Sequence, residues 1–119
     1  MSAFEIAPLL ELFDDDRIEV ANLLSTAARS VSGDVALVVS SNDAHDAREL
    51  RERAHRIKGT SGSIGAHALR EAAASLEGAA RNESWAAIPS LVETLRSAAS
   101  ELTSEISRYC TEATKGRTT

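Results

Sequence analysis

The chain has 119 residues, of which 43% are hydrophobic but only 3% aromatic, and a formal net charge of −5. This length predicts one small domain whose core is built from Ala, Leu, Val and Ile, which suits packed helices better than a sheet sandwich. The acidic charge argues against a general nucleic-acid binder, because such proteins neutralise phosphates with Lys and Arg. No apolar run approaches the ~20 residues of a membrane span, and the N-terminus lacks the basic start of a signal peptide. The single cysteine, Cys110, fits a reducing compartment and is expected to be partly buried in a helix.

The first elements in the chain are a short apolar helix and an acidic turn. The apolar spacing between Phe4 and Phe13 predicts the helix, with Pro8 near its start, where a missing N–H matters least. Asp14 to Asp16 suit the cap and first turn of the next helix, because acids complement the helix dipole there. That helix is predicted over residues 16–41 and through Gly33, from apolar residues three and four apart: Val20, Leu23, Leu24, Ala27, Val31, Val35 and Val38.

The third predicted helix follows a polar turn and carries a histidine on its outer side. Asp43 or Asp46 caps it, and its inward stripe is Leu50, Ala54, Ile57, Ser61 and Ile64. At 100° per residue, His55 projects about 140° from the centre of that stripe, toward solvent. The same outer side carries cations and residues without side chains: Arg48, Arg51, Lys58, Gly59 and Gly62.

Two further helices complete the chain. Gly65 ends or bends the third helix, and residues 66–80 form the fourth. Ser84 is expected to cap the last helix, with Pro89 about one turn inside it and Trp85 covering the bundle end. Short connections make successive helices antiparallel neighbours. We therefore predict an all-α fold, an up-down antiparallel four-helix bundle with a short extra N-terminal helix, in a single domain over residues 1–119 with a frayed tail from about residue 111.

An exposed histidine offers a nucleophile near neutral pH. The sequence shows no serine–histidine–acid arrangement, no nucleotide-binding glycine motif and no metal-ligand spacing, since His45 falls in a turn and His67 on the next helix. If His55 carries a phosphoryl group, Lys58 supplies a cation one turn away, and the glycines leave room for a partner's carboxylate. The alternatives are an ordinary surface histidine, a solvated basic face paired with Glu49 and Glu52, and a loosely wound helix end at Gly59, Gly62 and Gly65.

Residues 54–65, AHRIKGTSGSIG, resemble the histidine-containing phosphotransfer (HPt) domain family, whose pattern is roughly A-H-x-[LI]-K-G-x-x-x-x-x-G followed by a leucine and later Leu-Glu. The matching residues are Ala54, His55, Ile57, Lys58, Gly59, Gly65, Leu69, Leu76 and Glu77. The helix order and the acidic cap nine residues before the histidine also match, so the resemblance covers nearly the whole chain. It is strongest to the HPt domain at the C-terminus of hybrid sensor histidine kinases.

The resemblance implies that His55 accepts a phosphoryl group from the aspartyl phosphate of one receiver domain and passes it to the aspartate of another response regulator. By the same resemblance, Lys58 steadies the phosphoryl group and Gly59 permits docking. Glu77 would accept a hydrogen bond from Nδ1–H and leave Nε2 free, and Arg81 would lie near the phosphoryl group. We expect a phosphocarrier without ATP-dependent kinase activity of its own. No cofactor is expected, because the partner receiver would bring Mg²⁺.

The expected partners are receiver domains, including one in a hybrid sensor kinase in cis, with neither nucleic acid nor direct membrane insertion. We expect a cytoplasmic monomer, either free or at the cytoplasmic end of a membrane-bound kinase, because no second apolar stripe is left for a dimer. The surface around His55 is more basic than in many family members, which favours electrostatic selection of partners. One alternative hypothesis is a non-catalytic interaction module that docks an acidic partner on the basic face of residues 48–58. The other is a nucleic-acid binder that uses the same face, which the acidic net charge makes less favoured.

Overall fold

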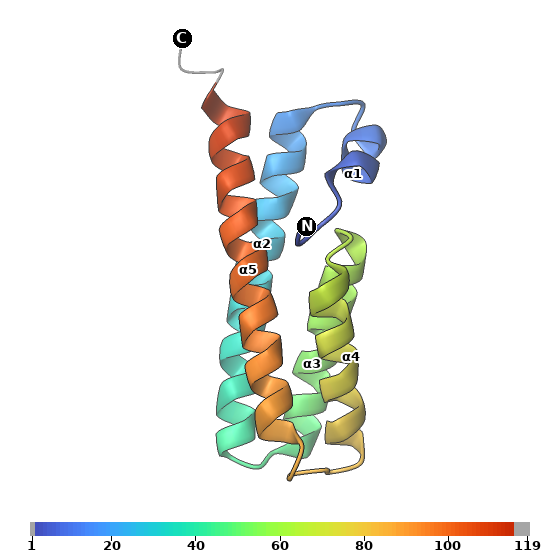
Figure 1. Cartoon of the computed structure of the whole chain (residues 1–119), viewed down its shortest axis with the longest axis vertical. Coiled ribbons are helices and arrows are strands. Elements are labelled where there is room, and N and C mark those ends of the chain that lie inside the picture. Colours follow the sequence, from blue (N-terminus) through green and yellow to red (C-terminus); the bar gives the residue numbers. More distant parts are fainter. Residues whose placement is uncertain (1, 116–119) are drawn as a thin grey trace.

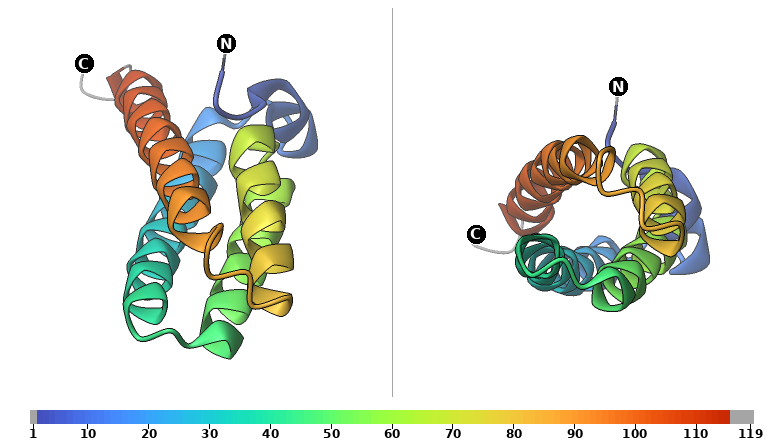
Figure 2. Two further views of the ribbon diagram at one scale, coloured as in Figure 1. Left: turned by 60° about the horizontal axis from the view of Figure 1, so that its bottom comes forward. Right: turned by 90° about the horizontal axis from the view of Figure 1, so that it is seen from below.

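The structure, a computed structural model, describes residues 2–115 and contains five α-helices in that range (Figure 1). Their bounds are α1 Ile6–Leu12, α2 Arg17–Asp43, α3 Ala47–Ser63, α4 His67–Arg81 and α5 Ile88–Lys115. The four long helices form a ring in the order α2, α3, α4, α5, with each helix antiparallel to its neighbours (Figures 1 and 2). The predicted all-α, up-down four-helix bundle with an extra N-terminal helix is therefore confirmed.

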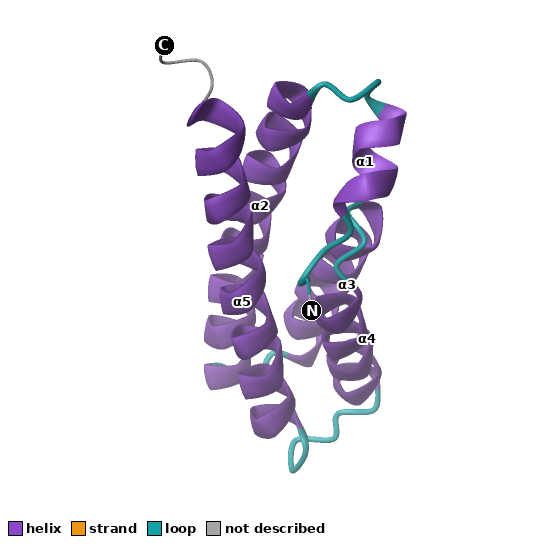
Figure 3. Cartoon of the chain, turned by 45° about the horizontal axis from the view of Figure 1, so that its top comes forward, coloured by secondary structure: helices purple, strands orange, loops and turns teal. Residues whose placement is uncertain are grey.

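The unequal lengths of the four helices explain the position of α1. Helices α2 and α5 have 27 and 28 residues, whereas α3 and α4 have 17 and 15. The longer pair extends past the upper ends of α3 and α4, and α1 lies over the ends of the shorter pair (Figure 3). None of the helices in residues 2–115 is long and apolar enough to span a membrane.

An aspartate caps the N-terminus of both α2 and α3, as expected from the sequence. The Asp16 carboxylate accepts from the amides of Ile18 and Glu19 at 3.2 and 3.1 Å, and α2 then continues unbroken through Gly33. The Asp46 carboxylate accepts from the amide of Glu49 at 3.1 Å. Each cap satisfies backbone donors that have no partner within the first turn, so helix starts are fixed locally.

The predicted inward stripe of α3 is buried throughout. Leu50, Ala54, Ile57 and Ser61 are 0% exposed and Ile64 is 1% exposed. The Ser61 hydroxyl donates to the carbonyl of Ile57 at 2.6 Å, so its burial leaves no unsatisfied donor. In the predicted inward stripe of α2, Leu23 is an exception. It is 36% exposed, whereas the adjacent Leu24 faces the core. The burial pattern fixes the rotation of α3 and therefore the side from which His55 projects.

The α2–α3 and α4–α5 connections both lie at the lower end of the bundle (Figure 1). Trp85 packs on the core there and stacks on the ring of His45, with centroids 4.3 Å apart and an interplanar angle of 7°. Helix α5 begins at Ile88 rather than directly after Ser84, so Pro89 lies in its first turn. The start is irregular, because Trp85 to Ala87 form a turn in which the Ser84 carbonyl accepts from the Ala87 amide at 2.9 Å and from the Ile88 amide at 3.1 Å.

The upper end depends on Gly65 and on the N-terminal segment. Gly65 follows α3 with φ of +70°, and a Cβ there would lie 3.0 Å from the Cβ of Glu5. Only glycine combines this left-handed backbone with so close an approach. Phe4 is buried edge-on against Tyr109, with ring centroids 6.3 Å apart. The N-terminal segment is thereby packed against the α3–α4 connection and against α5.

The predicted frayed tail from about residue 111 is wrong over residues 111–115, which continue α5 as helix. The reason is that Tyr109 and Cys110 still pack on the core, so the helix is anchored up to its last turns. Cys110 is half-buried, as expected, with Sγ 3.3 Å from the Ser25 hydroxyl. Residues 116–119 of the predicted tail lie outside the described residues.

Candidate functional site

His55 lies on the outer side of α3, and its side chain is 67% exposed. Its orientation follows from its neighbours, since Ala54 and Ile57 are fully buried and leave His55 no inward direction. The solvent-facing position predicted from helical phase is confirmed.

A carboxylate from α4 meets His55 across the helix pair. Glu77, whose side chain is 8% exposed, places Oε2 2.7 Å from Nδ1 of His55. Its Oε1 lies 2.6 Å from Nζ of Lys58, and Nη2 of Arg81 lies 3.8 Å from Oε2. The four residues that the resemblance implicates, His55, Lys58, Glu77 and Arg81, are thus brought together, although they come from two helices.

Electrostatics fix the ionisation of Glu77. The hydrogen bond from Lys58 lowers the pKa of this carboxyl, and the hydrogen bond from His55 acts in the same direction; together they outweigh burial, which raises it. An ionised carboxylate can only accept hydrogen bonds, so Nδ1 of His55 is the donor. In the neutral form of the ring, this places the lone pair on Nε2, which no described residue engages.

The basic residues of α3 divide into two groups. Arg53 and Arg56 turn toward α2, where Nη1 and Nε respectively lie 3.6 and 3.4 Å from the carboxylate of Asp34, which is 5% exposed. Nε of Arg53 also donates to Glu49 at 2.7 Å. The alternative of a face paired with Glu49 and Glu52 therefore holds for Arg53 with Glu49, and for Arg48 with Glu52 at 3.5 Å, whereas Arg56 pairs with Asp34 instead. The sequence analysis missed Asp34, although its position between Val31 and Val38 in the inward stripe was a signal.

Arg48 and Arg51, predicted as docking residues, line an open hollow between α3 and α4. This α3–α4 hollow has a volume of about 460 Å³ and is lined by Ala47, Arg48, Arg51, Glu52, Ala80, Arg81 and Glu83. Arg81 belongs both to this lining and to the cluster around Glu77, so the hollow adjoins the histidine site. Arg48 is 92% exposed and lies 3.5 Å from Glu52.

The two outward glycines differ from each other. A Cβ at Gly59 would meet no atom within 4 Å, so the surface there is open. A Cβ at Gly62 would lie 3.6 Å from both Cδ and Nε of Arg70, whose side chain therefore reaches over Gly62 from α4. The room expected above Gly62 is thus partly filled. The sequence analysis missed Arg70, although it precedes Glu77 by seven residues and so shares its side of α4.

The other two histidines make different contacts. His45 stacks on Trp85, and Nε2 of His67 lies 2.7 Å from the carboxylate of Glu5. Within residues 2–115, no three His, Cys, Asp or Glu side chains are grouped so as to hold a metal ion.

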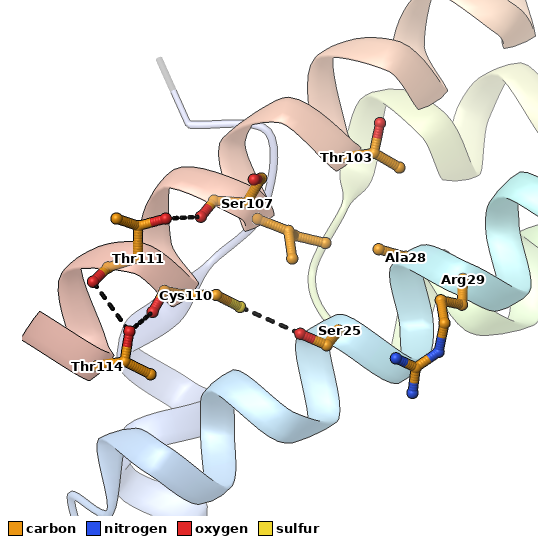
Figure 4. Close-up of a pocket in the computed structure, with 9 residues that line it drawn as sticks. Ser25, Ala28, Arg29, Thr103, Ser107, Cys110, Thr111 and Thr114 are labelled. Carbon is orange, nitrogen blue, oxygen red and sulfur yellow. Dashed lines mark hydrogen bonds between the residues drawn. The ribbon is translucent and has the colours of Figure 1, made fainter. Parts of the chain in front are cut away.

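The opposite side of the bundle carries a second open groove without such a cluster (Figure 4). This α2–α5 groove has a volume of about 430 Å³, and its lining is Ser25, Ala28, Arg29, Thr103, Ile106, Ser107, Cys110, Thr111 and Thr114. Arg29 is the one charged residue in that lining. The Thr111 hydroxyl donates to the carbonyl of Ser107 on its own helix at 3.0 Å. The convergence of acid and base is a property of the α3–α4 side.

The site is therefore an exposed imidazole that is held through Nδ1 by an ionised carboxylate, on a helix with open surface beside it at Gly59. The profile of the Hpt domain matches residues 9–108, and the chain belongs to this family. The crystal structure of histidine-containing phosphotransfer protein B from Pseudomonas aeruginosa PAO1 is similar, with a TM-score of 0.82 and 26% sequence identity. The match covers 89% of this chain and 90% of that chain. No curated protein sequence matches the chain.

Family membership supports histidine phosphotransfer as the activity, in a phosphocarrier rather than in a kinase. The predicted resemblance to HPt domains is confirmed.

Proposed function

We propose that His55 is a phosphorelay intermediate, which accepts a phosphoryl group on Nε2 from a receiver aspartyl phosphate and passes it to the aspartate of another response regulator. The observation that carries this proposal is the 2.7 Å contact between Nδ1 of His55 and the carboxylate of Glu77. It supports Nε2 of an exposed ring as the nucleophilic atom.

In the first transfer, the Nε2 lone pair forms a bond to phosphorus while the acyl phosphate P–O bond breaks and the donor aspartate leaves as a carboxylate. Nδ1 keeps its proton, so the phosphorylated ring carries a positive charge. Glu77 stabilises this charge through the hydrogen bond at Nδ1. In the second transfer, an oxygen of the acceptor aspartate bonds to phosphorus and the N–P electrons return to Nε2. Neither step requires a proton to move.

Lys58 and Arg81 supply positive charge beside the reacting atom. Both lie against the single carboxylate of Glu77, so the cluster has one cation in excess before phosphorylation. In this proposal Lys58, whose side chain is 33% exposed, is shared with the phosphoryl oxygens. Arg81 is 57% exposed and 3.8 Å from Glu77, which leaves it free to turn toward the same oxygens.

The receiver would dock over the open surface at Gly59 and against the α3–α4 hollow that Arg48 and Arg51 line. Gly62 belongs to this surface beneath the side chain of Arg70. The receiver would bring its own Mg²⁺, and this chain would need no cofactor. We further propose a single-domain monomer located in the cytoplasm, either free or as the cytoplasmic end of a sensor kinase, that takes no phosphoryl group directly from ATP.

The test is to mix the chain with receiver domains carrying radiolabelled aspartyl phosphate and follow the label. We expect label on the wild-type chain, stable to alkali and labile to acid, and its transfer onward to a second receiver. His55→Gln should remain unlabelled, whereas the matched control His67→Gln should be labelled like wild type. Efficient labelling of His55→Gln would contradict the assignment of His55 as the phosphorylated residue. Binding of receivers without any transfer would favour the non-catalytic interaction module.

A further inference from the structure

The cations on the α3–α4 side are not equally available to a partner. Lys58 and Arg81 lie against Glu77, Arg53 and Arg56 against Asp34, and Arg48 against Glu52. Arg51 and Arg70 are both exposed, and neither guanidinium forms a hydrogen bond or ion pair with any residue from 2 to 115. On the α3–α4 side, these two residues therefore carry positive charge that the fold does not use internally.

The two arginines stand on either side of the reactive histidine. Arg51 precedes His55 by four residues, about one helical turn, and lines the α3–α4 hollow. Arg70 reaches from α4 over Gly62, which follows His55 by seven residues. Eleven residues separate Arg51 from Gly62, which corresponds to about 16 Å along α3. His55 and the open surface at Gly59 lie between these two points.

An unpaired guanidinium is well suited to recognise a carboxylate on another protein. A paired cation must first break its existing ion pair before it can bind a partner. An unpaired guanidinium still has its whole positive charge and all of its N–H donors available for a carboxylate. Charges placed around a docking surface act mainly on the association rate and on orientation. Two such charges, one on each side of His55, would orient a partner along the axis of α3, which a single charge cannot do.

We propose that Arg51 and Arg70 form a two-point clamp for acidic side chains that flank the reactive aspartate of the docking receiver domain. The clamp rests on the proposed phosphotransfer function and deepens it, because it names the residues that set the orientation and selection of the receiver. Arg70 is thereby assigned as a specificity-determining residue of the docking surface. Neither arginine takes part in the chemistry at Nε2.

The experiment compares transfer from a phosphorylated receiver to the wild-type chain and to Arg51→Glu, Arg70→Glu and the double variant. The matched control is Arg29→Glu, since Arg29 is likewise exposed and unpaired among the described residues but lines the α2–α5 groove on the opposite side. At low ionic strength we expect each single variant to slow transfer about three- to tenfold and the double variant more than about tenfold. Arg29→Glu should stay within about twofold of wild type, and salt should narrow all these differences.

A second readout separates the clamp from the chemistry. Phosphoramidate, a small phosphodonor that needs no protein docking, should label His55 equally in wild type and in all four variants. The neutral variants Arg51→Gln and Arg70→Gln should also slow transfer from the receiver, but by less than the Glu variants. They serve as a control for a folding defect caused by charge reversal.

Several results would overturn the clamp. Transfer to Arg51→Glu or Arg70→Glu as fast as to Arg29→Glu would do so while leaving the role of His55 intact. Slower labelling by phosphoramidate in the same variants would show that they act on His55 itself rather than on docking. A wild-type chain that takes label from phosphoramidate but from no receiver would instead contradict the proposed function.

Discussion

The α3–α4 and α2–α5 sides of the bundle carry open depressions of similar volume, about 460 and 430 Å³, yet their polar groups behave differently. Beside the α3–α4 hollow, side chains cross between helices and meet at Glu77. In the α2–α5 groove, hydroxyls bond mainly back to their own helix, as Thr114 does to the carbonyl of Cys110 at 3.0 Å. The contrast shows that the volume of a depression does not distinguish the candidate site. The site is distinguished by side chains that converge from different helices.

The physical cause of the difference is the burial of one carboxylate. Glu77 shares its phase with the inward residues of α4, so its side chain is withdrawn from water and needs compensating donors. His55 and Lys58 on α3 provide them. The α2–α5 lining holds no carboxylate, and its interhelical polar contacts are those of the Cys110 thiol with Ser25 and with the carbonyl of Ala21.

The largest effect that would test this contrast is expected from Lys58→Ala. The substitution removes the cation nearest to Glu77 and to the proposed phosphoryl group, so transfer from a phosphorylated receiver should slow by at least about tenfold. Helicity measured by circular dichroism should stay at the wild-type level. The matched change on the other side, Ser25→Ala, removes a contact with Cys110 and should leave the transfer rate unchanged. Loss of helicity in Lys58→Ala would assign this lysine a structural role instead.

A smaller effect is expected on the pH dependence of stability in Glu77→Gln. The pKa of Glu77 in the folded chain is below its ordinary value of 4.5, so the ionised group stabilises the fold above that value. This stabilisation is lost as the pH falls through the lowered pKa. Urea unfolding should therefore show a steeper acid decline for wild type than for Glu77→Gln, and a variant about 1–2 kcal/mol less stable at pH 7.

The control for this measurement is Glu71→Gln, because Glu71 is an exposed residue of the same helix. Its free energy of unfolding should follow the wild-type pH profile. Equal acid declines for wild type and Glu77→Gln would contradict the assignment of an ionised Glu77 held by Lys58 and His55.

The smallest expected effect comes from Gly59→Ala, which separates stability from docking. A Cβ at Gly59 meets open space, so the variant should gain about 0.5–1 kcal/mol in unfolding free energy from its better helix propensity. Transfer from a receiver should nevertheless slow, because the methyl group would stand on the proposed docking surface. Gly33→Ala on α2 also meets open space and should gain similar stability with unchanged transfer. Unchanged transfer in Gly59→Ala would remove Gly59 from the docking surface.

Local signals in the sequence predicted much of the fold. The second and fourth helices were predicted over residues 16–41 and 66–80, and they occupy Arg17–Asp43 and His67–Arg81. Apolar periodicity and acidic caps are short-range properties, which is why they transfer directly to the structure. The start of α5 and the end of the chain were less predictable. Both ends carry contacts with residues far away in the sequence: Trp85, in the turn before α5, stacks on His45, and Tyr109, near the C-terminal end of α5, packs against Phe4.

The residues of the candidate site likewise fall into those that the sequence predicted and those that it did not. Helical phase placed His55 toward solvent, and the family resemblance added Glu77 and Arg81 to it. The pairing of Arg53 and Arg56 with Asp34, and the reach of Arg70 over Gly62, were not anticipated. Each of these contacts joins two helices whose relative rotation no single-helix pattern contains.

By itself, the sequence determined four long amphipathic helices, the start of α2 near Asp16, and a histidine that no rotation of α3 could bury without exposing its apolar stripe. It left Asp43 and Asp46 as alternative caps of α3, and the structure shows Asp46 in that role. Only the tertiary structure decided which charges are paired within the fold and which are left without a partner among residues 2–115. Glu77 lies 19 residues from Lys58 and 22 from His55, and Asp34 lies 22 residues from Arg56. Such pairs are set by the spacing and rotation of packed helices, because a charged side chain takes the nearest opposite charge that packing presents.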